Sequence, residues 1–379
     1  MVLQKEFVGV GCIEKVETLI KETKSKKILL VTGKQSYITS NAKDKLDIIL
    51  RNIYVEQFSQ FDVNPNLDDV YTGLKLFKNI EYDLVIAIGG GSVIDMAKLI
   101  NILSAQKNSD ILRYIKDSKL ISEKGAPLVA IPTTYGTGSE TTHFAVVYVN
   151  NTKYSLAHPF IMPCYSIVDP DLSCALPKHI AAASGMDALS QAVESYWSVK
   201  STRESKKYAS EAIVLIVDAI QDAVEGEEYA KKIMPVAAHL AGKAINITTT
   251  TAPHAISYPI TSKYGLQHGH AVALTLGKFF EINYQCSKNK LNDTRGVAKL
   301  NKTMDEIFSL MGVTGPSSCE IFWYSLMDRI GLEYDINKIG IRKDTDIRYI
   351  SNNVNLERLD NHPVKITKKD IWNIFYELK

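Results

Sequence analysis

Cysteine is rare in this sequence and follows no pattern. The 379 residues include five cysteines, which are scattered along the chain and never spaced as CxxC. A disulfide framework needs an even set at short spacings, and a cysteine-based zinc site needs CxxC-type pairs, so neither is expected. The five positions are Cys12, Cys164, Cys174, Cys286 and Cys319.

Long apolar runs and an excess of one charge are also missing. No stretch approaches the roughly 20 apolar residues of a membrane helix, and the segment MVLQKEFVGVGCIEKVETLI carries acidic residues and no signal-peptide cleavage site. Lys+Arg number 44 and Asp+Glu number 42, a net charge of +2, which provides no general surface for nucleic acid. We therefore expect a cytoplasmic protein without membrane or nucleic-acid partners, although net charge says nothing about one local pocket for a small anion.

The first half of the sequence alternates between strand-like and helix-like segments. A hairpin is expected within residues 145–158, around the Asn150–Asn151 turn. Repeated strand, glycine turn and helix predict an α/β domain, a parallel sheet with helices on both faces. The expected strands are 26–33, 52–58, 83–91, 127–134 and 165–170, and the expected helices are 67–79 and 92–105.

From about Leu176 onward the pattern becomes helical and strand signals almost vanish. Long periodic segments occur at 178–198, 205–225 and 229–245, and Thr367 is the expected N-cap of a final helix. The segment VDPDLSCALP supplies prolines and turn residues where the pattern changes. We therefore predict two domains, an α/β nucleotide-binding domain of residues 1–173 and an all-helical domain of residues 174–379.

Three glycines and a serine, Gly89 to Ser92, lie between a predicted strand and a predicted helix, with Asp95 in the first helical turn. Glycines let the backbone approach a pyrophosphate, and a helix N-terminus offers free N–H groups and partial positive charge to it. The motif is not the usual GxGxxG fingerprint, so an ordinary tight turn is the alternative. A second loop, IPTTYGTGSETT, carries Thr133, Thr134 and Thr137 at the same sheet edge, and two such loops favour a nucleotide site.

A second set of residues suggests a metal site. Asp187 and Gln191 are four residues apart on one predicted helix and share a face. His254 lies in a helical pattern, His268 follows in a glycine-flanked turn, and His270 is two residues further along. Oxygen and nitrogen ligands of this kind suit Fe²⁺, Zn²⁺, Mn²⁺, Co²⁺ or Ni²⁺, and an open coordination position would polarise a substrate oxygen. Taken singly, a helical aspartate is more often a solvated charge and a histidine more often a packed one.

As a set, these motifs resemble the iron-containing alcohol dehydrogenase family. The segments GGGSVIDMAK, IPTTYGTGSE, VDPDL, SGMDALSQAVE and HAISYP…QHGHA match it in order and spacing over roughly residues 5 to 375. The resemblance implies the dehydroquinate synthase-like fold, with a Rossmann-like N-terminal domain and an all-helical C-terminal domain. It also implies an active site in the cleft between them, where a nicotinamide cofactor meets a divalent metal, Fe²⁺ or Zn²⁺ first among the candidates. We further expect a homodimer.

The resemblance assigns roles position by position. Asp187, His254 and His268 become metal ligands. The cofactor positions are Gly90, Gly91 and Ser92 for the pyrophosphate, Thr133, Thr134 and Thr137 for the nicotinamide half, Lys153 for the ribose, and Asn64 and Asn66 for a loop near the cofactor mouth.

Three positions depart from the family pattern. Gln191 stands where most members have a metal-binding histidine, and Tyr258 stands where many have a histidine near the nicotinamide. Gly33 replaces the aspartate that NAD-preferring members often place against the ribose 2′-hydroxyl, and Lys34 and Ser36 could bind a 2′-phosphate there. We therefore predict that NADPH is accepted as well as NADH.

These departures point to a subgroup of the family. The segments SGMDALSQAVESYWS, TKYSLAHP and HAISYPITSKYGLQHGHAVALTL resemble the phosphonoacetaldehyde reductases, so the expected substrate is a small anionic aldehyde. Lys263, with Thr261 and Ser262, could meet a phosphonate dianion, and His158 is a further candidate. The alternative for Lys263 is a solvated surface charge. Tyr258 or His270 could supply the proton that completes the alcohol.

Three other functions compete with this one. The first is a general alcohol or aldehyde dehydrogenase of the same family that acts on uncharged short-chain substrates. The second is a sugar-phosphate cyclase or glycerol-phosphate dehydrogenase of the same fold, which the ligand spacing disfavours. The third is a nucleotide-binding protein that has lost catalysis through the change at Gln191.

Overall fold

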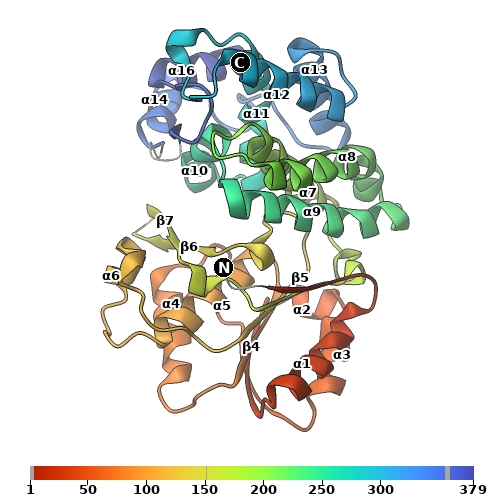
Figure 1. The fold of residues 1–379 in the computed structure, drawn as a ribbon, viewed down its shortest axis with the longest axis vertical. Coiled ribbons are helices and arrows are strands. Elements are labelled where there is room, and N and C mark those ends of the chain that lie inside the picture. Colours follow the sequence, from red (N-terminus) through yellow and green to blue (C-terminus); the bar gives the residue numbers. More distant parts are fainter. Residues whose placement is uncertain (1–3, 151, 355–358) are drawn as a thin grey trace. The chain divides into compact units, whose positions relative to one another are not determined.

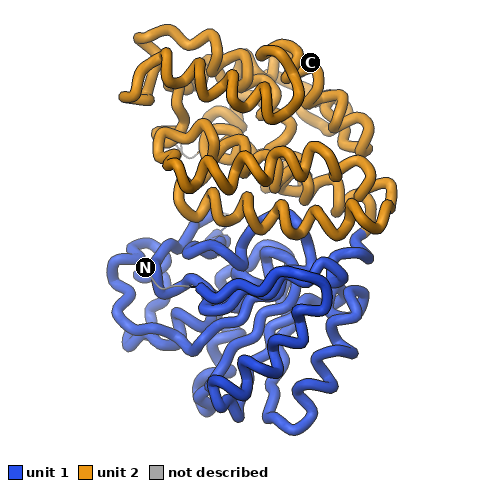
Figure 2. Tube along the Cα trace, turned by 45° about the vertical axis from the view of Figure 1, so that its right-hand side comes forward, with its two compact units in different colours: residues 1–176 blue, residues 177–379 orange. Residues whose placement is uncertain are grey.

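The computed structural model describes residues 4–150, 152–354 and 359–379. The chain forms two compact units, residues 1–176 and 177–379, which are coloured separately in Figure 2. The division falls three residues after the position 173/174 expected from the sequence, beyond the 3-10 helix Pro170–Ser173. The turn-rich segment named in the sequence therefore contains the junction.

Unit 1 is built on a six-stranded parallel sheet with strand order β1-β8-β5-β4-β2-β3 (Figure 1). Five of the strands lie where apolar runs predicted them. The strands are β1 Lys5–Val8, β2 Lys27–Thr32, β3 Tyr54–Phe58, β4 Leu84–Gly89, β5 Leu128–Pro132 and β8 Tyr165–Val168.

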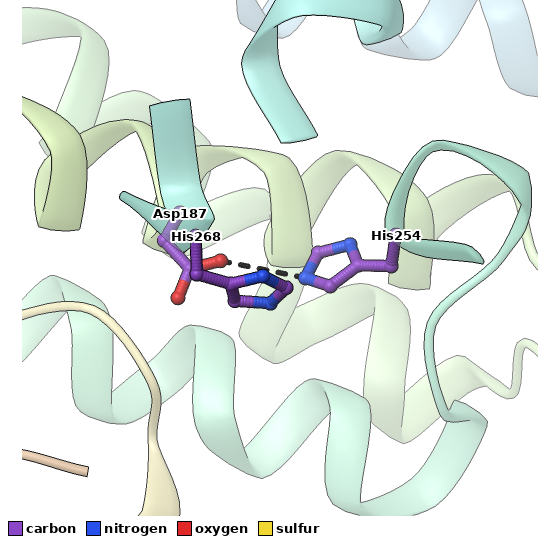
Figure 3. Close-up of side chains that lie close together, drawn as sticks. All are labelled: Asp187, His254 and His268. Carbon is purple, nitrogen blue, oxygen red and sulfur yellow. Dashed lines mark ion pairs between the residues drawn. The ribbon is translucent and has the colours of Figure 1, made fainter. Parts of the chain in front are cut away.

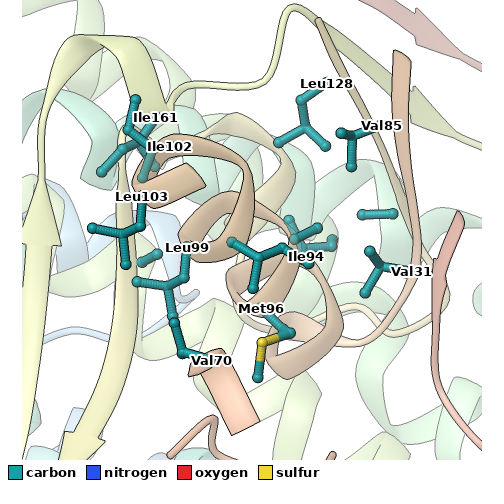
Figure 4. Close-up of a cluster of buried hydrophobic side chains, with 14 of the residues drawn as sticks. Val31, Val70, Val85, Ile94, Met96, Leu99, Ile102, Leu103, Leu128 and Ile161 are labelled. Atoms are coloured by element: carbon teal, nitrogen blue, oxygen red, sulfur yellow. The ribbon is translucent and has the colours of Figure 1, made fainter. Parts of the chain in front are cut away.

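Both faces of this sheet are buried, which explains why its two central strands, β4 and β5, are apolar at every position. In β4, Val85 and Ala87 belong to one hydrophobic cluster and Ile86 and Ile88 to the other. The first cluster packs against α4, α5 and α6, and part of it is drawn in Figure 4. The second packs against α1, α2 and α3. The bounds are α1 Lys15–Thr23, α2 Ser36–Thr39, α3 Ala42–Leu50, α4 Leu67–Leu74, α5 Gly91–Ser104 and α6 Leu112–Lys116.

A two-stranded antiparallel ribbon follows β5, formed by β6 Phe144–Val149 and β7 Thr152–Ala157. The expected hairpin is confirmed in these strands, although Asn151, half of its predicted turn, lies outside the described residues. Strand β1 was not predicted. It is four residues long, mostly exposed and located at the sheet edge beside β8, so its sequence carries no apolar run.

The described residues of unit 2 form helices joined by loops and include no strand, only an isolated antiparallel bridge between Leu291 and Val364, so the predicted helical character is confirmed. Its first helix, α7, is buried along most of its 20 residues. Thr367 is the N-cap of α16, where its side chain accepts a hydrogen bond from the Asp370 N–H. The helices are α7 Lys178–Trp197, α8 Arg203–Glu225, α9 Glu228–Thr248, α10 Ala252–Tyr264, α11 His268–Tyr284, α12 Val297–Leu310, α13 Pro316–Arg329, α14 Asp344–Asn352 and α16 Lys368–Glu377.

Two predicted absences can be compared with the structure. All five cysteines are free. Among the described residues, no helix combines the length and apolar character needed to cross a bilayer.

A buried histidine near the C-terminus makes the helical unit sensitive to acid. His362 is fully buried between the rings of Trp197 and Phe279, at centroid distances of 5.7 and 4.9 Å. Neither ring nitrogen has a hydrogen-bond partner among the described residues, and burial lowers the pKa of the imidazole to about 3. The folded protein therefore keeps this ring neutral at pH values where an unfolded chain binds a proton.

We expect the wild type to lose stability between pH 6.5 and pH 3 partly because of His362. The unfolded state takes up the proton below about pH 6.5 and the folded state only below about pH 3, so acid favours unfolding by about 1.4 kcal/mol per pH unit in that window. His362→Phe should lack this component. Urea unfolding of chelator-treated protein at pH 7.5, 6.0 and 5.0 measures the difference, with His179→Gln, at an exposed histidine, as the control.

Candidate active site

Three helices of unit 2 bring potential metal ligands together. Asp187 of α7, His254 of α10 and His268 of α11 each offer a ligand atom within 4.8 Å of the other two (Figure 3). The Nε2 atom of His254 lies 3.4 Å from the Asp187 Oδ1 atom. Asp187 and His254 are buried and His268 is half-buried. Residues separated by up to 81 positions in the sequence thus converge on one point.

The donor atoms around this point suit a divalent cation. Within the described part of the chain, His254 Nε2 and Gln191 Oε1 are buried without a hydrogen bond, which is costly unless a bound group satisfies them. Gln191 lies one helical turn after Asp187 on the same face of α7 and is almost fully buried. A carboxylate, two imidazoles and an amide oxygen form a set that first-row divalent metals accept.

The charge of His254 is controlled by two carboxylates. Burial by itself lowers the pKa of this imidazole, but Glu194 and Asp187 outweigh that effect and raise its pKa to about 9. His254 Nδ1 contacts Glu194 Oε2, and Nε2 faces Asp187. Without a metal, His254 therefore carries a positive charge that offsets the negative charges of the two carboxylates. A bound cation would offset the same two charges.

Glu194 was not singled out from the sequence. It lies seven residues after Asp187, so it falls on the same face of α7 as Asp187 and Gln191. That spacing was the available signal, but a glutamate on a long helix is usually a solvated charge. Here its side chain is fully buried.

The position of His268 depends on a close approach between α11 and α7. A Cβ atom on Gly269 would lie 2.0 Å from the Ala183 carbonyl oxygen and 2.6 Å from the Asp187 Cβ atom. Only glycine permits this distance, because the obstacle includes backbone that cannot move aside. The sequence suggested that His268 lies in a loop turn, but it is the first residue of α11. The close approach of this end of α11 to α7 places His268 beside Asp187.

Of the other predicted catalytic residues, Tyr258 is near the cluster. It lies one turn after His254 on α10, and its ring stacks on His268 with a centroid distance of 5.8 Å and an interplanar angle of 15°. His270 Nε2 is 2.6 Å from the Glu333 carbonyl oxygen, and burial lowers the pKa of that imidazole. A neutral ring in this position donates its one proton to the carbonyl.

Lys263 is not brought to the cluster. It lies nine residues after His254, which is roughly 13 Å along α10 and on the opposite face. Its ammonium pairs with Asp346 Oδ1 at 3.0 Å and lies over the ring of Tyr349. The alternative of a surface charge therefore describes Lys263 better than contact with a substrate does.

Unit 1 holds the second constellation, at the carboxyl ends of β4 and β5. Gly90 is the N-cap of α5 and Gly91 its first residue. A Cβ atom on Gly91 would lie 2.5 Å from Thr137 Cγ2, and one on Gly90 would lie 3.4 Å from Thr134 Cγ2. The threonine loop thus lies directly against the glycine turn, as expected for two parts of one nucleotide site.

Three more predicted cofactor residues flank this turn. The Asn64 N–H donates to Ser92 Oγ at 3.0 Å, which ties the loop after β3 to the start of α5. Asn66 is the N-cap of α4, and its side chain accepts from the Asp69 N–H. Thr133 is buried, and its hydroxyl oxygen has no hydrogen-bond partner among the described residues.

Asp95, by contrast, points at protein groups. It accepts hydrogen bonds from Ser139 Oγ at 2.5 Å and the Val146 N–H at 3.0 Å. Desolvation raises the pKa of its carboxyl, and Lys98 and Lys153 oppose that effect. Asp95 therefore holds the segment after the threonine loop, and a role for it in cofactor binding stays a prediction.

Lys98, one turn after Asp95, also holds the segment after the threonine loop. This role was not predicted from the sequence. Its buried ammonium donates to Ser139 Oγ, to Thr142 through both its carbonyl and its hydroxyl oxygen, and to the Phe144 carbonyl, at 2.8 to 3.1 Å. Burial lowers its pKa to about 8. A lone lysine in the otherwise apolar stretch of α5 was the sequence signal.

The residues proposed to choose between the two nicotinamide cofactors lie after β2. A Cβ atom on Gly33 would lie 2.2 Å from Ser36 Oγ. Lys34 pairs with Asp62 at 3.5 Å, and both side chains are largely exposed. A pair this exposed contributes little and leaves the ammonium available to an anion.

We expect Gly269→Ala to lower metal affinity by more than tenfold, because the added Cβ would push His268 away from Asp187. Metal content after dialysis against a fixed concentration of Zn²⁺ measures the effect. Gly315→Ala is the control, since a Cβ there meets nothing within 4 Å and its φ of 178° is ordinary extended backbone. Equal metal content in the two variants would show that the helix approach does not position the ligand.

The sequence matches two family models that together span nearly the whole chain. Residues 4–170 match the iron-containing alcohol dehydrogenase model, and residues 181–378 match the C-terminal model of the Fe-containing alcohol dehydrogenase family. An NAD-dependent methanol dehydrogenase of Bacillus methanolicus is 29% identical over 352 residues, which is 91% of this chain and 90% of that protein.

Two further relatives act on aldehydes, according to their names. A phosphonoacetaldehyde reductase of Streptomyces viridochromogenes is 32% identical over 256 residues, which span 65% of this chain and 65% of that protein. The structure of sulfoacetaldehyde reductase from Bifidobacterium kashiwanohense, in complex with NAD⁺, is 26% identical with a TM-score of 0.88 and covers 99% of this chain and 96% of that one. The predicted fold class is confirmed, and the chain is an oxidoreductase that belongs to the iron-containing alcohol dehydrogenase family.

Proposed function

We propose that this protein reduces phosphonoacetaldehyde to 2-hydroxyethylphosphonate with NADPH or NADH and a divalent metal. The metal ligands would be Asp187, Gln191, His254 and His268. The observation that carries the proposal is the convergence of a carboxylate and two imidazoles within 4.8 Å, beside Gln191 Oε1 and His254 Nε2, which are buried without a hydrogen bond among the described residues.

The reduction adds a hydride to the aldehyde carbon and a proton to its oxygen. When bound, the nicotinamide supplies the hydride and the metal polarises the carbonyl oxygen. The chain itself contributes the ligand geometry, the loops that would hold the nucleotide, and a proton donor. Tyr258 is our candidate donor, because its ring lies on His268 while the proton of His270 is engaged by the Glu333 carbonyl.

The choice of an anionic aldehyde rests on two relatives and on the sequence. Phosphonoacetaldehyde and sulfoacetaldehyde are both acetaldehydes with a tetrahedral anionic group, and reductases of both are similar to this chain. The Gln191 and Tyr258 departures resemble the phosphonoacetaldehyde subgroup. A cytoplasmic location and a homodimer remain predictions.

A second candidate is the reduction of uncharged short-chain aldehydes. The methanol dehydrogenase alignment covers 91% of the chain, against 65% for the phosphonoacetaldehyde reductase, and favours this alternative. Lys263, which the sequence offered for a phosphonate, pairs with Asp346 and lies on the face of α10 opposite His254, which also favours this alternative.

We expect kcat/KM for phosphonoacetaldehyde to exceed that for propanal by at least tenfold, assayed with NADPH and NADH across Zn²⁺, Fe²⁺, Mn²⁺, Co²⁺ and Ni²⁺. The physical reason is that a binding site built for an anionic substrate has polar groups that an uncharged aldehyde such as propanal cannot satisfy. Faster turnover of propanal would select the second candidate. Absence of turnover with every metal would favour a nucleotide-binding protein impaired by Gln191.

Cofactor preference gives a separate prediction. Gly33→Asp should reduce kcat/KM for NADPH at least tenfold and leave NADH less affected, because a carboxylate repels the 2′-phosphate and accepts from the 2′-hydroxyl. Any side chain at this position must displace the Ser36 hydroxyl. Gly33→Asn is therefore the matched control, equal in size but uncharged. An equal loss in both variants would assign the effect to shape and not to charge.

A further inference from the structure

Glu194 is a buried carboxylate just outside the set of metal ligands. Its Oε1 atom accepts hydrogen bonds from the Thr251 N–H and the Thr251 hydroxyl, both at 2.8 Å. Its Oε2 atom contacts Nδ1 of His254. The side chain is fully buried, so these groups replace the solvent that a charged carboxylate would otherwise need.

The two nitrogens of His254 face different partners. Nδ1 faces Glu194, and Nε2 faces Asp187 and the ligand cluster. A neutral imidazole carries one proton, and an ionised carboxylate can only accept. The contact with Glu194 therefore requires the proton on Nδ1, which leaves the lone pair of Nε2 directed at the position between the ligands.

The carboxylate cannot easily rotate out of this arrangement. Trp197 Nε1 donates to Thr251 Oγ1 at 3.0 Å, so the Thr251 hydroxyl directs its own proton to Glu194. The Thr251 N–H adds a second donor to the same oxygen. The His254 N–H is a third, longer donor to Oε1 at 3.5 Å, so Oε1 is fixed by backbone and hydroxyl donors and Oε2 remains for the His254 ring.

We infer that Glu194 is a positioning residue, which holds His254 in the tautomer and orientation that can bind a metal through Nε2. The inference rests on the metal site of the proposed function and not on its substrate. A carboxylate on the far nitrogen also makes an imidazole a more basic ligand. The stronger binding of the metal by His254 offsets part of the metal affinity that is lost because Gln191 replaces a histidine ligand.

The substitution Glu194→Gln tests the inference because the network fixes how the amide must lie. Two donors at Thr251 require the amide oxygen on their side, so the amide NH₂ group faces Nδ1 of His254. That group donates, and Nδ1 must then accept. The proton moves to Nε2 and blocks the metal-binding lone pair.

The measurement is the dissociation constant of Zn²⁺ from competition with a chromophoric chelator, without cofactor or substrate. We expect Glu194→Gln to weaken Zn²⁺ binding by about 10- to 100-fold. Glu306→Gln is the matched control, since Glu306 pairs with Lys206 and Tyr196 away from the ligand set and its variant should bind Zn²⁺ like the wild type.

A second readout does not depend on a stable variant. In wild-type protein with ¹⁵N-labelled histidine and bound Zn²⁺, His254 should show a protonated Nδ1 in a hydrogen bond and a metal-bound Nε2. Metal on Nδ1, or unchanged affinity in Glu194→Gln, would overturn this inference alone. A wild type that binds no Zn²⁺ would overturn the metal site and the proposed function with it.

Discussion

The candidate metal centre depends on the contact between the first turn of α11 and the backbone of α7. Gly269 makes the contact possible, because any side chain there would collide with the Ala183 carbonyl. Asp187 and His268 come together through this contact, and His254 joins them from α10. These three ligands thus come from three different helices. The packing of the helices therefore sets the distances between the ligands, and close packing allows little adjustment.

The electrostatics of the centre follow from its two buried carboxylates. Asp187 and Glu194 flank the His254 ring and hold a proton on it in the absence of metal. A divalent cation bound by Asp187 and His254 would be close to the same two negative charges. Gln191 changes the strength of one ligand without changing this balance, since an amide and a neutral imidazole carry the same charge.

Much of the fold could be predicted from the sequence because burial on both faces of the sheet makes its central strands apolar at every position, as in β4. Strand β1 escaped prediction because an exposed edge leaves no such pattern. The metal ligands could be named as types, but their convergence required the packing of α7, α10 and α11. The roles of Glu194 and Lys98 depend on partners 41 to 60 residues away, and the Lys263–Asp346 pair spans 83 residues. Contacts between residues this far apart cannot be inferred from local sequence patterns.

The attachment of the threonine loop to α5 has a consequence for nucleotide recognition. Asp95 and Lys98 bind the segment that follows Thr137, and they belong to the same helix whose first turn contains Gly91. Glycine turn and threonine loop are therefore parts of one rigid body. The conformational entropy of the loop is lost when the chain folds, so a nucleotide that binds there does not have to order it, and more of the contact energy remains as affinity.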